Sequence, residues 1–305
     1  MKRLTKEIKR IRLIAAIAVG VSALLLNLDV ARAAYDGPIT DAHAHMARDI
    51  DHDDLIALYE KADVSHAGIF VRFGNAERLR HRFPTNFLLF VDPYRGKRRN
   101  YRLSESRLDE LSGLLNNKIA AGVGEFYVNL SFAPFNRSGI QTDLAASEQQ
   151  SFLKKVNELG EILHIHDEVV GTATQNAFRN FPDIRFVLAH SGYLKPDRLR
   201  KLLLENNNLY ADLSLISNRH FGPFNKAPPV ALNPSEKWKS LLSDFSTRFL
   251  VASDIGANRE RTRLLPAVIA DYRVLLGHLP RAAAENIAFR NFERLFVGPE
   301  LKSLQ

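Results

Sequence analysis

Apolar and polar positions follow two alternating periods along most of the chain. Short runs rich in β-branched and aromatic residues predict eight strands, at residues 39–45, 67–73, 87–92, 122–128, 161–166, 184–190, 209–214 and 248–254. Amphipathic stretches with a helical period lie between and after them, at residues 53–61, 76–82, 104–117, 143–159, 172–180, 196–205, 235–244, 262–275 and 280–296.

This alternation predicts the fold class. Strands separated by helices pair in parallel through right-handed crossovers, and eight such units close naturally into a (β/α)8 TIM barrel. A doubly wound open sheet is the alternative. Because no low-complexity linker divides the chain, we expect a single domain at residues 34–305.

The first 33 residues have the pattern of a secretory signal peptide. Six basic residues precede an apolar run at residues 13–28, and Ala31-Arg32-Ala33 follows as a cleavage site. The run is shorter than the roughly 20 residues of a membrane-spanning helix. We therefore expect cleavage after Ala33, a periplasmic or secreted protein, and no stable membrane span; an uncleaved leader would instead anchor the protein to the membrane. The chain has no cysteine, so it carries neither a lipid-attachment cysteine nor a disulfide.

The leader also carries most of the positive charge. Residues 1–33 hold seven of the 42 Lys and Arg and two of the 34 Asp and Glu, so the remainder has a net charge of +3 rather than +8. The only dense basic run is residues 95–99. This small net charge disfavours a nucleic-acid partner. We expect a small-molecule substrate, and a homo-oligomer is possible.

Metal-binding side chains gather at the carboxyl ends of the predicted strands. In DAHAH at 41–45, a period of two puts Asp41, His43 and His45 on one face. An HxH pair alone is equally compatible with ordinary hydrogen bonds. The later strands end in GVGEF, HIHDE, LAHSG and ASDIG, and barrel enzymes keep their chemistry at this end. Buried carboxylates and imidazoles need a shared cation, so we predict a metal site formed by His43, His45, Glu125, His166, His190 and Asp254.

Together with ENIAFRNFERLF at 285–296, these motifs resemble the amidohydrolase superfamily, and within it the amidohydrolase-related group (amidohydrolase 2), with TatD-type nucleases as neighbours. The resemblance implies one or two divalent metal ions, expected to be zinc, and two sets of ligands. His43, His45 and Asp254 would bind the more buried ion, and Glu125, His166 and His190 a second ion if one is present. Many members have a carboxylated lysine where this chain has Glu125, which leaves the number of ions at one or two.

The resemblance also implies a metal-dependent hydrolase of an ester, lactone, amide or phosphoester bond in a small molecule. Asp254 would accept the proton of the attacking water, and Asp254 or His190 would return it to the leaving group. The alternatives are a single-metal decarboxylase or other lyase, a TatD-like nuclease, and a metal-binding barrel without activity.

Substrate contacts are expected from the loops after the strands. Arg72, Arg95 and Tyr127 follow the second, third and fourth predicted strands, and the arginines favour an anionic substrate. We expect Arg259 to face the same region, and His164 to lie one layer below His166 in the core. His220 and the long loop at residues 217–233 are further candidates for covering the site.

Overall fold

The computed structural model describes residues 33–47, 49–93, 104–130, 140–214, 232–256 and 258–297. The chain divides into two units, Met1–Ala34 and Tyr35–Gln305, and the second is described below. The expected leader falls almost wholly outside the described residues, so its cleavage stays a prediction. Within the described residues, no helix has both the length and the apolar character needed to cross a membrane.

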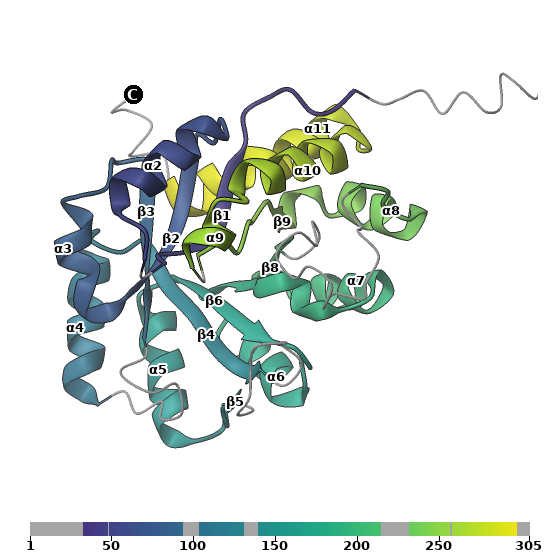
Figure 1. Cartoon of the computed structure of the whole chain (residues 1–305). Helices are drawn as coiled ribbons and strands as arrows, with labels where there is room; N and C mark the ends of the chain where they lie inside the picture. Colours follow the sequence, from purple (N-terminus) through teal and green to yellow (C-terminus); the bar gives the residue numbers. More distant parts are fainter. Residues whose placement is uncertain are drawn as a thin grey trace, which may run out of the picture. The chain divides into compact units, whose positions relative to one another are not determined.

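Eight parallel strands form a nearly closed barrel in the order β1-β2-β3-β4-β6-β7-β8-β9, which confirms the predicted TIM barrel (Figure 1). Ala44 bridges Ile255 in parallel, and the N–H of Ala42 donates to the carbonyl of Val251 at 2.9 Å, so β1 meets the chain after β9. A short strand, β5, pairs antiparallel with β4 and was not predicted. The strands are β1 (Thr40–His45), β2 (His66–Arg72), β3 (Phe87–Asp92), β4 (Gly122–Leu130), β5 (Ile140–Gln141), β6 (Ile162–Asp167), β7 (Arg185–Leu188), β8 (Leu209–Asp212) and β9 (Phe249–Leu250).

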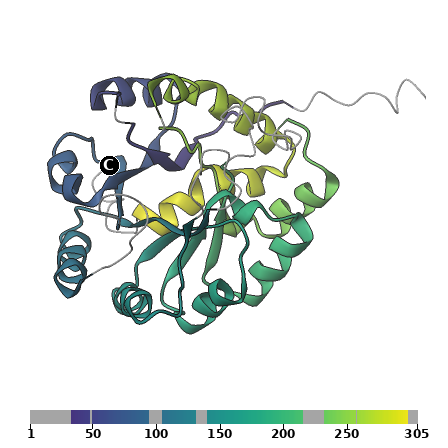
Figure 2. The same ribbon diagram turned by 60° about the horizontal axis from the view of Figure 1, so that its bottom comes forward.

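Helices surround the strands, as Figure 2 shows in a view along the barrel. The described part of the chain ends in α11 followed by two π-helical segments, Asn286–Arg290 and Glu293–Val297. The helices are α2 (His52–Lys61), α3 (Ala76–Arg80), α4 (Glu105–Asn116), α5 (Ser147–Glu158), α6 (Thr172–Asn180), α7 (Pro196–Glu205), α8 (Glu236–Asp244), α9 (Arg259–Thr262), α10 (Leu265–Gly277) and α11 (Arg281–Glu285).

The buried apolar residues form two clusters. The larger cluster lies between the strands and the helices and includes Ile69 and Val71 of β2. The smaller cluster fills the barrel and includes Phe70 of β2, with Phe292 and Phe296 of the C-terminal segment packed against it. Side chains alternate along a strand, so every second residue points into the barrel. The inward-pointing residues beyond this cluster lie at the carboxyl end of the strands.

Strand β1 departs from regular alternation. Its register with β2 shifts between Asp41 and Ala44. Ala42 consequently joins the inner cluster, while the Asp41 carboxylate accepts hydrogen bonds from the Tyr59 hydroxyl of α2 and the Ser253 N–H, both at 2.7 Å. The prediction that Asp41 shares a face with the two histidines was wrong, because a β-bulge turns the side chains within it.

Candidate metal centre

His43 and His45 direct their Nε2 atoms toward each other at 3.2 Å. The Nδ1 of His43 donates to an Asp212 oxygen at 2.8 Å, so Nε2 of its neutral form carries a lone pair. Oδ1 of Asp254 lies 3.5 Å from the His43 Nε2 and 3.4 Å from the His45 Nε2. Nitrogen and oxygen atoms that converge in this way need a proton or a cation between them.

Glu125 lies between two pairs of imidazoles. Its Oε2 is 3.4 Å from Nε2 of His45 and 3.8 Å from Nε2 of His43. Its Oε1 is 2.5 Å from Nδ1 of His166 and 3.3 Å from Nε2 of His190. The structure thus brings all six predicted ligands together, and a carboxylate between two nitrogen pairs is suited to one ion or to two.

His190 and Asp254 reach the centre through left-handed backbone turns. The predicted strand at 184–190 is shorter in the structure, because β7 ends at Leu188 and the chain then turns, with φ of 56° at His190. Asp254 has φ of 49°. Such conformations cost about 1–2 kcal/mol for residues other than glycine. Each N–H has a firm acceptor: His190 donates to Asp212 Oδ1 at 2.8 Å, and Asp254 donates to the His43 carbonyl at 2.7 Å.

Two glycines allow the backbone to approach the site closely. At Gly124, with φ of 148°, a Cβ atom would lie 2.6 Å from Cβ of His164. At Gly256, with φ of 114°, a Cβ atom would lie 1.8 Å from the carbonyl oxygen of His45. Each glycine follows or precedes a predicted ligand by one or two positions, so a side chain at either position would displace the centre.

Asp212 organises two of the imidazoles and was not predicted from the sequence. Its Oδ2 accepts from Nδ1 of His43, and its Oδ1 accepts from the N–H of His190 and from the N–H and hydroxyl of Ser214, the last two at 3.0 and 2.5 Å. Since the Ser214 hydroxyl donates to Asp212, it accepts from Nδ1 of His190 at 2.6 Å. One buried carboxylate therefore sets both tautomers and leaves Nε2 of His43 and of His190 facing the centre.

Glu168 is a second residue that the sequence reading missed. This buried carboxylate lies 3.3 Å from Nε2 of His166 and so holds the ring with Nδ1 toward Glu125. A signal existed for both residues, since Asp212 and Glu168 stand at or just past strand ends. That signal is the same one that identified Asp254.

The charges of the centre favour a bound cation. Burial acts to lower the pKa of His45, but hydrogen bonds to Asp254 and Glu125 outweigh burial and raise it to about 10. Burial acts likewise on His166, yet the neighbouring Glu125 raises its pKa to about 9. Burial alone would raise the pKa of Asp254, whereas the hydrogen bond from His45 and the nearby imidazoles lower it below its ordinary value. In the absence of a metal, protons on these imidazoles balance the carboxylates. Imidazole nitrogens and carboxylate oxygens are also a donor set that zinc accepts.

His164 lies beneath the centre, as expected. Its ring packs 4.9 Å from that of Phe70 and 5.0 Å from that of Phe90, and neither ring nitrogen has a hydrogen-bond partner among the described residues. Burial lowers the pKa of His164 to about 3, so it is neutral and belongs to the core.

Two of the predicted substrate-binding residues, Arg72 and Tyr127, lie on the side of the metal centre, one exposed and one buried. Arg72 is exposed at the end of β2, two residues beyond Phe70, whose ring contacts His43 at 4.7 Å; alternation therefore puts Arg72 on the side of the centre. It pairs with no carboxylate in the part of the chain that the structure describes. Tyr127 is buried, with its ring 5.3 Å from the ring of His166.

Other candidates lie elsewhere. Arg259 forms an ion pair with Asp54, and a role for it in substrate binding stays a prediction. Arg95, His220 and most of the loop at 217–233 lie outside the described residues, and their roles stay predictions.

The family model described as Amidohydrolase matches residues 116–237, about two fifths of the chain. This stretch contains Glu125, His166, His190 and Asp212, and the match confirms over these residues the resemblance drawn from the motifs. No curated protein matches the sequence.

Several solved structures share the fold across most of the chain. A Pseudomonas putida protein and an Acinetobacter baumannii protein, both provisionally designated 2-pyrone-4,6-dicarboxylic acid hydrolases, align with TM-scores of 0.64 and 0.61 at 15% and 14% identity. Each alignment covers 86% of this chain and 98% or 100% of the other. The 2,6-dihydroxybenzoate decarboxylase from Rhizobium aligns with a TM-score of 0.57 at 12% identity, covering 86% of this chain and 99% of its own. At these identities the likeness shows the barrel fold, which both hydrolases and decarboxylases use.

Proposed function

We propose that this amidohydrolase-type barrel is a metal-dependent hydrolase that cleaves an ester, lactone, amide or phosphoester bond in a small molecule. The observation that carries the proposal is the position of Glu125, whose two oxygens face two separate pairs of imidazole nitrogens while Asp254 closes one side. A group of carboxylates and imidazoles buried this deeply is costly unless it binds positive charge.

The ligand sets follow from these distances. His43, His45 and Asp254 would hold one ion, and Glu125, His166 and His190 would hold a second or orient the first. We propose zinc as the ion. When bound, such an ion supplies Lewis-acid polarisation of the scissile group and lowers the pKa of water toward ~7.

Asp254 is the carboxylate best placed to accept the proton of the attacking water. Its side chain is 17% exposed, against 3% for Glu125 and 0% for Asp212, so solvent and substrate reach it most readily. Its pKa lies below the ordinary value, so it is ionised at neutral pH and ready to accept. Asp254 then donates this proton to the leaving group; alternatively Nε2 of His190, which faces the centre, first accepts the proton of the water and then donates it.

Arg72 and Tyr127 would contact the substrate. Arg72 offers a guanidinium without a carboxylate partner in the described part of the chain, on the side of β2 that faces the centre. Tyr127 packs against His166. The charge of Arg72 suits an anionic small molecule, and Arg95 would add positive charge if it also reaches the centre.

A decarboxylase or other lyase is the second candidate. Arg72, which pairs with no carboxylate among the described residues, suits a carboxylate substrate, and the decarboxylase from Rhizobium shares the fold. Release of carbon dioxide from an aromatic carboxylate, without net hydrolysis, would favour this candidate.

The test combines elemental analysis of the purified protein with a screen of ester, lactone, amide and phosphoester substrates. The proposal expects a stoichiometric divalent metal and hydrolysis of at least one class, both lost after chelation and restored by zinc. Stoichiometric metal with carbon dioxide release alone would replace the hydrolase by the lyase. Full activity after complete removal of metal would contradict both.

A further inference from the structure

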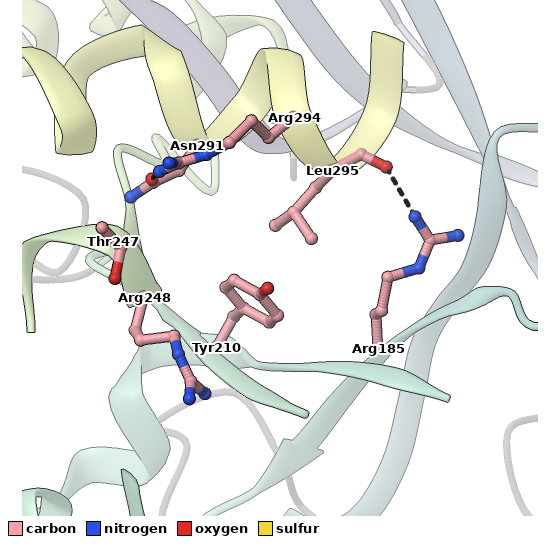
Figure 3. A pocket seen from close by; sticks show the side chains of 7 residues that line it. All are labelled: Arg185, Tyr210, Thr247, Arg248, Asn291, Arg294 and Leu295. Carbon is pink, nitrogen blue, oxygen red and sulfur yellow. Dashed lines mark hydrogen bonds between the residues drawn. The ribbon is translucent and has the colours of Figure 1, made fainter. Parts of the chain in front are cut away.

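A cavity of about 300 Å³ lies at the opposite end of the barrel from the metal centre (Figure 3). It is lined at the amino ends of β7 and β8, at the short 3-10 turn before β9 and at the C-terminal helical segment. The other ends of β7 and β8 lead to His190 and Asp212, so the cavity and the centre are separate sites. The polar lining residues are Arg185, Tyr210, Thr247, Arg248, Asn291 and Arg294.

The lining is strongly positive. It contains three arginines and no Asp or Glu. None of the three guanidinium groups forms an ion pair with a carboxylate in the described part of the chain. Arginines elsewhere do so, for example Arg273 with Asp63 at 3.0 Å and Arg290 with Glu285 at 2.7 Å. Like charges that line one space give it a positive potential, which favours the binding of an anion.

Two of the arginines are held in place by neutral groups. Arg185 donates to the carbonyls of Leu295 and Gly160 at 3.1 and 2.9 Å, and Arg248 donates to the carbonyl of Leu209 at 2.7 Å. These bonds orient the guanidinium groups, and the carboxylate of Glu161, which interacts electrostatically with Arg185, forms no ion pair with it and does not line the cavity. Arg248 also donates to the carbonyl of Asn206 at 3.3 Å and to Oδ1 of Asn207 at 3.4 Å. A guanidinium has five N–H donors, so three donors of Arg185 and two of Arg248 have no acceptor among the described residues.

The opposite wall is formed by the C-terminal segment, above Tyr210 and Arg248 in Figure 3. Arg294 donates to the Oδ1 of Asn291, whose Nδ2 donates to the Phe249 carbonyl at 2.7 Å. Arg294 belongs to the second π-helical segment, and π turns recur at functional sites. The hydroxyls of Tyr210 and Thr247 add neutral donors.

We propose that this cavity binds a small phosphate-bearing anion. Guanidinium groups that come from three elements around one space suit a tetrahedral dianion, which offers oxygens in several directions, better than a planar carboxylate, which pairs with a single fork. The cavity is larger than inorganic phosphate, and a phosphomonoester of a small alcohol would fill more of it. The inference stands apart from the proposed reaction, because none of its residues belongs to the metal centre.

The test titrates the purified protein with inorganic phosphate by calorimetry, at an ionic strength held constant with chloride. Arg294→Gln is the informative variant, because Arg294 is exposed and its loss leaves the bonds of Arg185 and Arg248 in place. Arg290→Gln is the matched control: it removes the same charge from the same segment, but Arg290 is paired with Glu285. We expect saturable binding by the unaltered protein and by Arg290→Gln, and affinity at least about tenfold weaker for Arg294→Gln.

Glycerol phosphate in place of inorganic phosphate distinguishes the source of the ligand: tighter binding identifies a phosphomonoester, and equal or weaker binding identifies the free ion. The proposal is overturned if phosphate acts no differently from chloride. If the two variants weaken phosphate binding equally, the binding depends only on the net charge of the segment, and the proposed site is excluded. If Arg294→Gln keeps full affinity while Arg72→Gln loses it, phosphate binds beside the metal centre and the cavity is not the site.

Discussion

Asp212→Asn tests how the metal centre is organised. The carboxylate of Asp212 accepts four hydrogen bonds, from Nδ1 of His43, the N–H of His190, and the N–H and hydroxyl of Ser214. An asparagine has one acceptor oxygen and one NH2 group, so its NH2 must face some of these donors. If it faces His43, the imidazole must take the other tautomer and direct Nε2–H at the ion.

Asp212→Asn should weaken metal binding and lower the stability of the fold. Removal of a carboxylate that orients a ligating histidine typically weakens metal binding about 10–100-fold. A buried donor left without an acceptor costs about 1–3 kcal/mol, which lowers the melting temperature by several degrees in a domain of this size. The assay is competitive metal titration against a chelating dye, together with thermal unfolding of the metal-free protein.

Asp41→Asn is the matched control. Asp41 is as buried as Asp212, but its carboxylate accepts from the backbone N–H of His43, from the Tyr59 hydroxyl and from Ser253, and it contacts no imidazole ring in the described part of the chain. This variant should lose stability and keep metal affinity within about threefold of the unaltered protein. The reasoning is refuted if Asp212→Asn binds metal as tightly as the unaltered protein, or if both variants lose metal affinity equally.

Further predictions concern the ligands, protons, substrate and leader. His43→Asn combined with His45→Asn should abolish metal retention while circular dichroism still shows the folded barrel, because the ligands lie above the packed layers; retained stoichiometric metal would exclude the assigned centre. The pKa values of His45 and His166, about 10 and 9, lie above the unfolded value of about 6.5. The metal-free protein should therefore lose stability progressively as pH rises from about 6.5 to about 10, and metal binding at pH 7 should release protons in calorimetry with two buffers; binding without proton release contradicts this. Arg72→Gln should raise KM about tenfold or more for an anionic substrate and leave kcat nearly unchanged, and an unchanged KM would remove Arg72 from substrate binding. Mass spectrometry of the exported protein should place its first residue near Ala34, and an intact Met1 would indicate a membrane anchor.

The sequence allows prediction of the barrel because each strand and helix has its own local period. It also indicates the six candidate ligands that the structure brings together, because each is a side chain of a metal-binding type at the carboxyl end of a predicted strand. It does not show that β1 contains a bulge, since the pattern DAHAH has the same alternation whether or not Ala42 turns inward. The shift depends on the register between β1 and β2.

Contacts between distant elements account for what could not be predicted. Asp212 resembles any acid at a strand end until the fold brings it against His43 and Ser214. The cationic cavity combines Arg185, Arg248 and Arg294, which are far apart in the sequence and show no common motif. The ion pair of Arg259 with Asp54 likewise joins residues that are far apart in the sequence.

The central claim is that the centre holds a metal ion and that Asp254 is its base. The most direct measurement determines metal content and turnover on the same preparation of Asp254→Asn. The amide keeps an oxygen that can contact the ion but loses its basicity, so the account predicts a substantial fraction of the normal metal content with turnover reduced by at least ~10²-fold. Near-normal turnover with metal bound would contradict the assignment of Asp254 as the base.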